Sequence, residues 1–218
     1  MGKITVVYNN VEGDRRLKTG WGLSCLVEQG EELILYDVGP SAEDLFFNMG
    51  VLGIDIKKIR KIVLSHPHHD HTGALKEVCR EIPKNAELYL PGKIKGKEEI
   101  ADKIYVYAAR GVVAHENVLV IDSRRGLIIV TGCAHPGIYR ICRAIKDDFR
   151  KDIYAALGGF HFEYYPAIFV KILGSLLLRL GIEVIGPNHC TGERAITVLR
   201  GVFQEGFLDL GSGKIFTF

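Results

Sequence analysis

The sequence predicts an α/β fold in which sheets and helices form several layers. Short apolar runs rich in Val, Ile, Leu and Tyr alternate with segments of helical period, and Gly, Pro or Asn closes each of them. A chain of 218 residues is long enough to bury a sizeable core. With 47% hydrophobic and 25% charged residues, the composition is that of a folded globular protein rather than a disordered one.

Strands outnumber helices in the first half of the chain. The short runs of β-branched and aromatic residues predict strands at Ile4–Tyr8, Leu23–Glu28, Leu33–Asp37, Lys61–Ser65 and Leu88–Leu90. Gln29-Gly30 suits a hairpin turn between the second and third of these strands. Segments of helical period predict helices at Ala42–Met49 and at about Gly73–Glu81, and a basic loop follows at Gly92–Lys97.

The second half opens with a hairpin, Val118–Asp122 and Leu127–Thr131, which are joined by a polar turn through Arg124, Arg125 and Gly126. Helix and strand then alternate. The predicted helices are Ile138–Phe149, Pro166–Leu180 and Glu193–Val202, and the predicted strands are Ile153–Leu157, Glu183–Ile185 and Lys214–Phe218. Both halves thus show a hairpin followed by alternating helix and strand, and no linker separates them. We therefore expect a single domain, 1–218, with two structurally similar halves.

Charge, cysteine usage and hydropathy narrow the class of protein. The chain has 28 Lys and Arg against 26 Asp and Glu, a net charge of +2 without a long block of one sign, which disfavours nucleic-acid and membrane-surface partners. Five cysteines without a C-x-x-C pair are typical of reduced thiols in an intracellular protein. The longest apolar stretch, Ala167–Leu180, is interrupted by Lys171, Gly174 and Arg179, so it predicts a buried amphipathic helix rather than a membrane span. The sequence predicts a cytoplasmic protein of undetermined oligomeric state.

A cluster of histidines lies where one predicted strand ends and a helix begins. The segment Ser65-His66-Pro67-His68-His69-Asp70-His71-Thr72-Gly73 contains four histidines and one carboxylate. Such groups are costly to bury without a partner, and the usual partner is a metal ion. A turn at a strand end can direct His66 and His68 at one ion while Asp70 and His71 point at a second. Imidazoles with one carboxylate suit Zn²⁺, as one or two ions, and also Fe or Mn where oxygen ligands dominate. The alternative is a polar loop with chance histidines.

Three further histidines also follow predicted strand ends. They are His135 in Thr131-Gly132-Cys133-Ala134-His135, His161 in Gly158-Gly159-Phe160-His161, and His189 in Gly186-Pro187-Asn188-His189-Cys190. In layered α/β folds, ligands and catalysts collect at strand ends along one edge, so we expect the three to converge on the histidine cluster. One such histidine alone is more often a structural residue. Three of them, framed by Gly or Pro, favour functional roles for at least two.

Several motifs, taken in order, resemble a known family. His66-Pro67-His68-His69-Asp70-His71 fits the pattern H-x-H-x-D-H, and Leu35-Tyr36-Asp37-Val38-Gly39 looks like a strand-Asp-x-Gly motif. Over essentially the whole chain the sequence resembles the metallo-β-lactamase superfamily. Further motifs look like its branch of 7,8-dihydropterin-6-methyl-4-(β-D-ribofuranosyl)aminobenzene-5′-phosphate synthase-like proteins: Gly22-Leu23-Ser24, Thr131–Ile138, Gly158–His161 and Pro187–Gly192. The resemblance implies an α/β fold of the four-layer αββα sandwich type with a hydrolytic site of one or two metals.

The resemblance also implies a ligand for each motif position. The implied ligands are His66, His68 and His135 for one metal, and Asp70, His71 and His189 for the other. Asp37 would hold the histidine loop in place. His115 is an alternative third ligand, which we rank lower because Ala114-His115-Glu116 has no Gly or Pro frame.

The sequence departs from the family pattern at one position. Where many members have Gly-Asp, with the Asp bridging two metals, Gly132 is followed here by Cys133. Either Cys133 or His135 takes that place, or the bridge is absent, so the number of metals stays open.

The predicted function is that of a metal-dependent hydrolase, which uses metal-bound hydroxide on a small phosphorylated or ester substrate. Asp70 would ligate and orient the nucleophile, and His161 would contact the substrate or donate a proton to the leaving group. A purely structural role for His161 has equal weight. The alternative function is a transferase like the synthases of this branch, releasing pyrophosphate, and a non-enzymatic metal-binding sensor comes third.

Basic residues suggest where a phosphorylated substrate would enter. Arg15, Arg16, Lys18 and Trp21 on one loop, with Lys93, Lys95 and Lys97 on another, could line a phosphate-binding mouth. Lysines that are simply solvated are the favoured interpretation.

Overall fold

The computed structural model describes residues 2–111 and 115–218. The chain divides into two compact units, one made of Met1–Ile94 with Leu210–Phe218 and the other of Lys95–Asp209. The expectation of a single domain, 1–218, stays a prediction.

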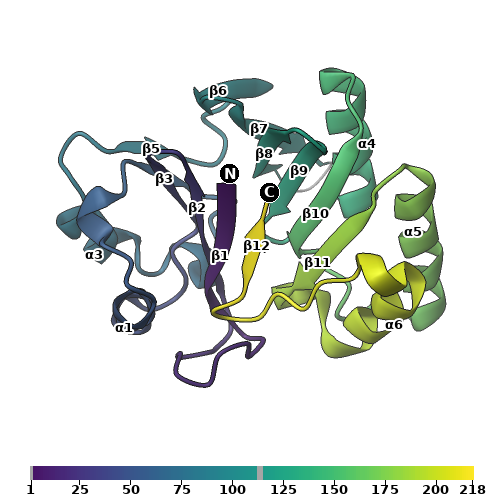
Figure 1. Cartoon of the computed structure of the whole chain (residues 1–218), viewed down its shortest axis with the longest axis horizontal. Helices are drawn as coiled ribbons and strands as arrows, with labels where there is room; N and C mark the ends of the chain where they lie inside the picture. Colours follow the sequence, from purple (N-terminus) through teal and green to yellow (C-terminus); the bar gives the residue numbers. More distant parts are fainter. Residues whose placement is uncertain (1, 112–114) are drawn as a thin grey trace. The chain divides into compact units, whose positions relative to one another are not determined.

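A six-stranded sheet with the strand order β12-β1-β2-β3-β4-β5 is the frame of the first unit (Figure 1). Its strands are β1 (Gly2–Asn9), β2 (Leu23–Gln29), β3 (Glu32–Tyr36), β4 (Lys61–Val63), β5 (Glu87–Tyr89) and β12 (Ile215–Thr217). Its helices are α1 (Ala42–Leu52), the short η1 (Ile56–Lys58), α2 (His69–Thr72) and α3 (Leu75–Glu81). Leu45 of α1 and Val78 of α3 pack into a buried apolar cluster with Leu35 and Ile62 of the sheet, so these helices cover one of its faces.

The second unit has a six-stranded sheet of its own, in the order β11-β10-β9-β8-β7-β6. Its strands are β6 (Lys97–Ala101), β7 (Ile104–Arg110), β8 (His115–Ser123), β9 (Gly126–Thr131), β10 (Ile153–Gly159) and β11 (Val184–Asn188). Its helices are α4 (Ile138–Phe149), α5 (Ala167–Arg179), η2 (His189–Thr191), α6 (Glu193–Phe203) and η3 (Gln204–Gly206). Along the strands β9 to β11 run α4, α5 and α6 (Figure 1), and Ile141, Leu177 and Leu199 join these helices to the buried core.

The two sheets share one pattern of strand directions. In the first unit β12, β1, β2 and β3 are antiparallel neighbours, and β3, β4 and β5 are parallel. In the second unit β6, β7, β8 and β9 are antiparallel neighbours, and β9, β10 and β11 are parallel. The prediction of two structurally similar halves is confirmed. In both units the chain leaves the ends of parallel strands in loops, and these loops carry the predicted ligands.

Local sequence explains where the helices begin and end. In α4 the buried residues Ile138, Ile141, Cys142 and Ile145 recur at helical spacing, as the sequence predicts. The helix α1 begins after Ser41, because the Ser41 side chain caps it by accepting a hydrogen bond from the backbone N–H of Asp44 at 3.3 Å.

Two predicted details are wrong. Asp37 is not the last residue of a strand, since β3 ends at Tyr36 and Asp37 has a φ of 56°. The helix predicted at Gly73–Glu81 is shorter at its start, because α3 begins at Leu75 and a separate short helix, α2, precedes it.

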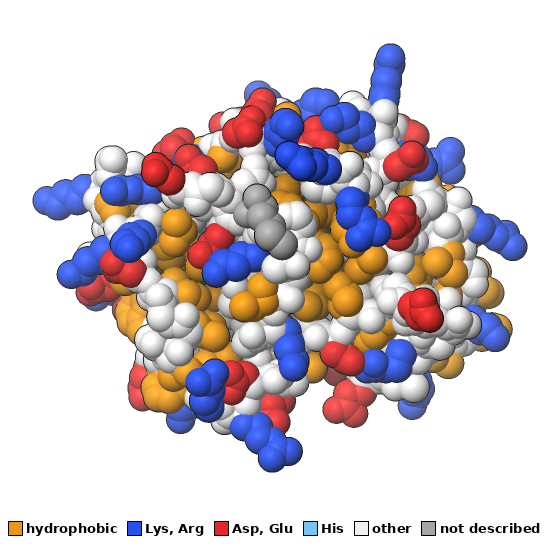
Figure 2. All heavy atoms as spheres, viewed as in Figure 1, with side chains coloured by type: hydrophobic (Ala, Val, Ile, Leu, Met, Phe, Trp, Pro, Cys, Tyr) orange, Lys and Arg blue, Asp and Glu red, His pale blue; other side chains and the backbone are white. Residues whose placement is uncertain are grey.

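Charges of both signs are mixed on one face of the molecule. In the face shown in Figure 2, Lys and Arg side chains alternate with Asp and Glu, and no large area has a single sign. Among the described residues, every helix is too short or too polar to cross a membrane.

The second sheet requires glycine at position 158. Gly158 in β10 has a φ of +106°, and a Cβ there would overlap the carbonyl oxygen of Thr131 in β9. We expect Gly158→Ala to lower the free energy of unfolding by about 3 kcal/mol or more, which urea denaturation measures. Gly201 in α6 is the matched control, because a Cβ there meets nothing within 4 Å. Gly201→Ala should raise the free energy of unfolding by about 0.5–1 kcal/mol, and equal effects of the two variants would contradict this placement.

Candidate metal centre

The histidine loop of the first unit leaves the sheet where β4 ends. His66 is buried in this loop, and His71 is fully buried in the short helix α2. His68 and His69 are exposed. The six residues from His66 to His71 thus run from the loop into the helix α2, and the structure buries the first and the last of them.

Four side chains of this segment bring together atoms that could bind a metal. Nε2 of His66 lies 3.1 Å from Nδ1 of His68, and Nε2 of His71 lies 3.5 Å from Oδ2 of Asp70. The ring centroids of His66 and His71 are 4.2 Å apart. Around a tetrahedral Zn²⁺ with bonds of about 2.0–2.1 Å, neighbouring ligand atoms are roughly 3.3 Å apart. The donor types and their spacing in this loop therefore fit a divalent ion.

Asp37 is the buried carboxylate that holds the histidine loop. Its Oδ1 accepts the backbone N–H of Ser65 at 2.7 Å, and its Oδ2 accepts the Ser65 hydroxyl and Nδ1–H of His71, each at 2.7 Å. Its own carbonyl accepts the Ser24 hydroxyl at 2.9 Å. Asp is one of the few residues besides Gly that tolerate a positive φ, which the turn at this position needs. The role expected for Asp37 is thus visible in its contacts.

The same network determines the tautomers of two histidines. Nδ1 of His66 lies 2.9 Å from the Ser65 hydroxyl oxygen. Since that hydroxyl donates its only hydrogen to Asp37, its oxygen accepts a hydrogen bond from Nδ1–H of His66. His66 and His71 both carry the proton on Nδ1, so each has its lone pair on Nε2. This is the neutral form that a metal ion binds.

In the second unit, Glu116 is the buried carboxylate that holds a loop, as Asp37 does in the first unit. Its carboxylate is buried and accepts the backbone N–H groups of Gly132, Cys133, Ala134 and His135 at 2.9, 3.1, 3.0 and 3.1 Å. Oε2 also lies 3.3 Å from Nδ1 of His135. One carboxylate thus holds the whole loop after β9 and orients the imidazole at its end. Glu116 was not predicted as a site residue, although an acidic residue at the start of an apolar strand was a usable signal.

His161 lies beside two cysteines and beside His135. One ligand atom each of Cys133, His161 and Cys190 lies within 4.8 Å of the others. The ring centroids of His161 and His135 are 4.7 Å apart. Hydrogen bonding to Cys133, and then to His161, lowers the pKa of Cys190 to about 5 against the opposing effect of burial. The hydrogen bond to Cys190 is also the main reason why the pKa of His161 is raised.

Strained backbone marks the loops of the second unit. Ala134, His161 and His189 have φ values of 55°, 58° and 48°, in the left-handed region that residues other than Gly rarely adopt. His189 is also fully buried, in η2 directly after β11. Such strain persists only where the surroundings hold it in place, and it is typical of functional sites.

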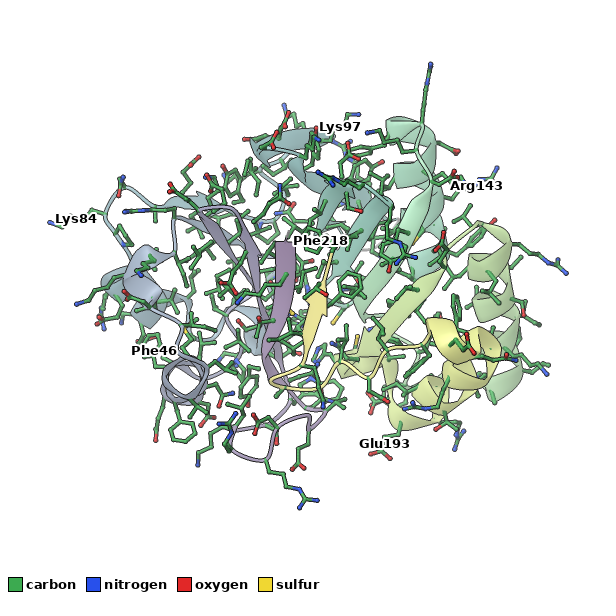
Figure 3. All side chains as sticks on the ribbon, viewed as in Figure 1. Phe46, Lys84, Lys97, Arg143, Glu193 and Phe218 are labelled. Carbon is green, nitrogen blue, oxygen red and sulfur yellow. The ribbon has the colours of Figure 1, made fainter. Side chains whose placement is uncertain are left out.

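His115 and the basic loops lie outside these clusters. His115 is exposed at the first position of β8, and Ala114 lies outside the described residues. Arg16 pairs with Asp14 at 2.6 Å. Lys97, labelled in Figure 3, donates to the Asp148 carbonyl at 3.2 Å and lies over the Phe149 ring at the end of α4. These contacts explain Arg16 and Lys97 without a bound phosphate.

Comparison with known proteins identifies the family of this chain. The family profile described as the metallo-beta-lactamase superfamily matches residues 22–167. A curated protein of Methanocaldococcus jannaschii, 7,8-dihydropterin-6-methyl-4-(beta-D-ribofuranosyl)-aminobenzene-5′-phosphate synthase, is 31% identical, and the match covers 90% of each chain. The chain belongs to the metallo-β-lactamase superfamily, in the branch of these synthase-like proteins. A second protein of the same organism, uncharacterized, is 24% identical over 82% of this chain and 86% of its own.

Solved structures show the same fold. Tm1679, described as a metal-dependent hydrolase of the beta-lactamase superfamily, matches with a TM-score of 0.85 and 22% identity over 100% of this chain and 99% of its own. The metallo-beta-lactamase fold protein YhfI from Bacillus subtilis matches with a TM-score of 0.66 and 14% identity over 99% and 98%. The predicted α/β fold class, the αββα sandwich of the metallo-β-lactamase type, is confirmed. This fold implies that the chain binds a divalent metal and supports an enzymatic activity.

Proposed function

We propose that the protein is a metal-dependent hydrolase of a small phosphorylated or ester substrate. The observation that carries this proposal is the Asp37 network, which places the lone pair of both His66 and His71 on Nε2. The carboxylate of Asp70 and Nδ1 of His68 lie within 3.5 Å of those two nitrogen atoms. A site prepared in this way suits a metal and has no evident purpose without one.

The proposed metal ligands are those that the family resemblance implies. They are His66, His68 and His135 for one ion, and Asp70, His71 and His189 for the other. When bound, a divalent ion lowers the pKa of water to about 7 and polarises an acyl or phosphoryl oxygen. Zn²⁺ is the proposed ion, as one or two per chain, with Fe or Mn as alternatives because of the carboxylate.

The residues of this chain would orient the reaction. Asp70, next to Nε2 of His71, would accept a hydrogen bond from the attacking water and fix its direction. His161, held by Cys190 beside His135, would contact the substrate and give a proton to the leaving oxygen. A cytoplasmic location, expected from the cysteine usage, belongs to the same proposal.

A synthase activity is the second candidate. The relative that is 31% identical is named as a synthase, so the same ligands would in that case hold a pyrophosphate leaving group while an arylamine attacks. A non-enzymatic, metal-binding sensor is the third candidate function.

Turnover separates these functions. We expect the metal-loaded protein to hydrolyse the diester probe bis(p-nitrophenyl) phosphate, and His161→Ala to lower kcat about 100-fold with little change in KM. His115→Ala is the matched control, since His115 is an exposed histidine of the same unit, and its kcat should stay within about twofold. Pyrophosphate release that needs an arylamine, without diester hydrolysis, would contradict the hydrolase and favour the synthase. No turnover of either kind at full metal occupancy would favour the sensor.

A further inference from the structure

A cavity of about 350 Å³ lies wholly within the second unit, between the end of β7 and the start of α4. Its volume is within the range of roughly 300–1,000 Å³ that small-molecule sites occupy. Tyr107, Ala109 and Ile141 contribute buried apolar surface to its wall. The Tyr107 hydroxyl donates a hydrogen bond to Oδ2 of Asp148 at 2.7 Å, so the polar end of this side chain already has a partner. The interior is therefore suited to the organic part of a ligand.

Two arginines give this cavity its charge. Arg110 at the end of β7 and Arg140 in the first turn of α4 both line it, and none of the other lining residues is charged. Within the described part of the chain, no carboxylate lies within 4.0 Å of either guanidinium. Arg143, one turn further along α4, is by contrast within 3.9 Å of Asp147 and points away from the fold in Figure 3. The cavity thus holds two guanidinium groups that no described carboxylate pairs with, while the Asp148 carboxylate accepts the hydrogen bond of the Tyr107 hydroxyl.

The cavity adjoins the loop that carries a proposed metal ligand. Pro136 lines the cavity and directly follows His135. Arg110 pairs across the sheet with His115, whose neighbour Glu116 holds that loop. The first helical residue of α4 comes two positions after Pro136, and no side chain caps this helix, so its positive end adds to the attraction of an anion.

We propose that Arg110 and Arg140 bind a phosphate group of the substrate that is not itself cleaved. A guanidinium group binds phosphate through paired N–H donors. Two guanidinium groups that line one cavity suit a doubly charged phosphate monoester. The sugar or ring that carries this phosphate would lie on Tyr107 and Ile141, and the scissile ester would reach the side of Pro136 on which His135 lies. The inference rests on the proposed function, because it names the substrate class of the same site as a small molecule with a second, remote phosphate.

Two probes that differ in one phosphate test this assignment. Thymidine 5′-(p-nitrophenyl phosphate) carries only the diester, whereas its 3′-phosphate derivative adds a remote monoester. For the metal-loaded protein we expect KM to be about tenfold lower for the 3′-phosphorylated probe, from charge-assisted hydrogen bonds. The double variant Arg110→Gln with Arg140→Gln should remove this difference and leave kcat for the simpler probe unchanged. Arg143→Gln is the matched control and should keep the tenfold preference.

A binding measurement keeps the test independent of turnover. By calorimetry, thymidine 3′,5′-bisphosphate should bind about tenfold more tightly than thymidine 5′-phosphate, and only the double variant should lose that preference. Equal KM and equal affinity for both members of each pair, or a preference that persists in the double variant, would overturn the assignment. If neither probe is hydrolysed but the arginine-dependent binding preference is present, the hydrolase proposal fails and the phosphate site stands.

Discussion

Replacing Asp37 with Asn should lower metal affinity and activity about 10–100-fold and destabilise the fold by about 1–3 kcal/mol. The two oxygens of Asp37 accept three hydrogen bonds, from two donors of Ser65 and from Nδ1–H of His71. An amide has one acceptor oxygen, so in either orientation its NH₂ group would face a donor. If it faces His71, that imidazole can regain a hydrogen bond only by moving its proton to Nε2, which removes the lone pair proposed to bind metal.

The control for this prediction is Asp55→Asn. Asp55 caps the short η1 by accepting the backbone N–H of Lys57 at 3.0 Å, and Asn caps a helix about as well as Asp. Its metal content should match that of the original protein, and its stability should stay within about 0.5 kcal/mol. Metal analysis and urea denaturation of both variants check the comparison. Normal metal content in Asp37→Asn would show that Asp37 does not determine the histidine tautomers.

Glu116→Gln should cost the second unit about 2–4 kcal/mol of stability and lower the affinity for the metal held through His135 about 10–100-fold. Oε1 of Glu116 accepts three backbone N–H groups, and Oε2 accepts the backbone N–H of His135 and faces its Nδ1. Whichever oxygen becomes NH₂, at least two donors lose an acceptor. The loop after β9 would then lose the anchor that sets the direction of His135.

Glu183→Gln is the matched control for this second prediction. Glu183 is exposed and pairs with Arg125 at 3.1 Å, so its loss should change the free energy of unfolding by less than about 1 kcal/mol. Hydrogen exchange of the backbone N–H groups of Gly132 to His135 provides a local readout, and it should accelerate only in Glu116→Gln. Unchanged exchange in that variant would mean that the carboxylate does not hold the loop.

Periodicity and motif spacing were sufficient to predict most of the fold. The bounds predicted for α4 match the structure, because its apolar residues recur at clean helical spacing and Gly137 precedes them. The hairpin of β8 and β9 was found from its apolar runs and polar turn. The strands β6 and β7 were both missed. In β6, Lys97, Glu98 and Glu99 are charged and exposed, which protects an edge strand from pairing but is also typical of a loop.

The site was predictable where the sequence places functional residues close together. The histidine loop is one continuous motif, and the structure brings its four predicted ligands together. Contacts between distant residues were not predictable from one sequence. Glu116 is 16 to 19 positions from the N–H groups it holds, and Cys190 is 57 positions from Cys133. Only the pairing of β8 with β9, and the parallel register of β9, β10 and β11, make these residues neighbours.

Metal content per chain, in protein purified without added metal, tests the central claim most directly. We predict one or two ions per chain in the original protein, the loss of an ion in His135→Ala or in His189→Ala, and no loss in His161→Ala. An original protein that contains no metal, or a His161→Ala variant that loses it while His135→Ala and His189→Ala keep it, would contradict the proposed metal centre.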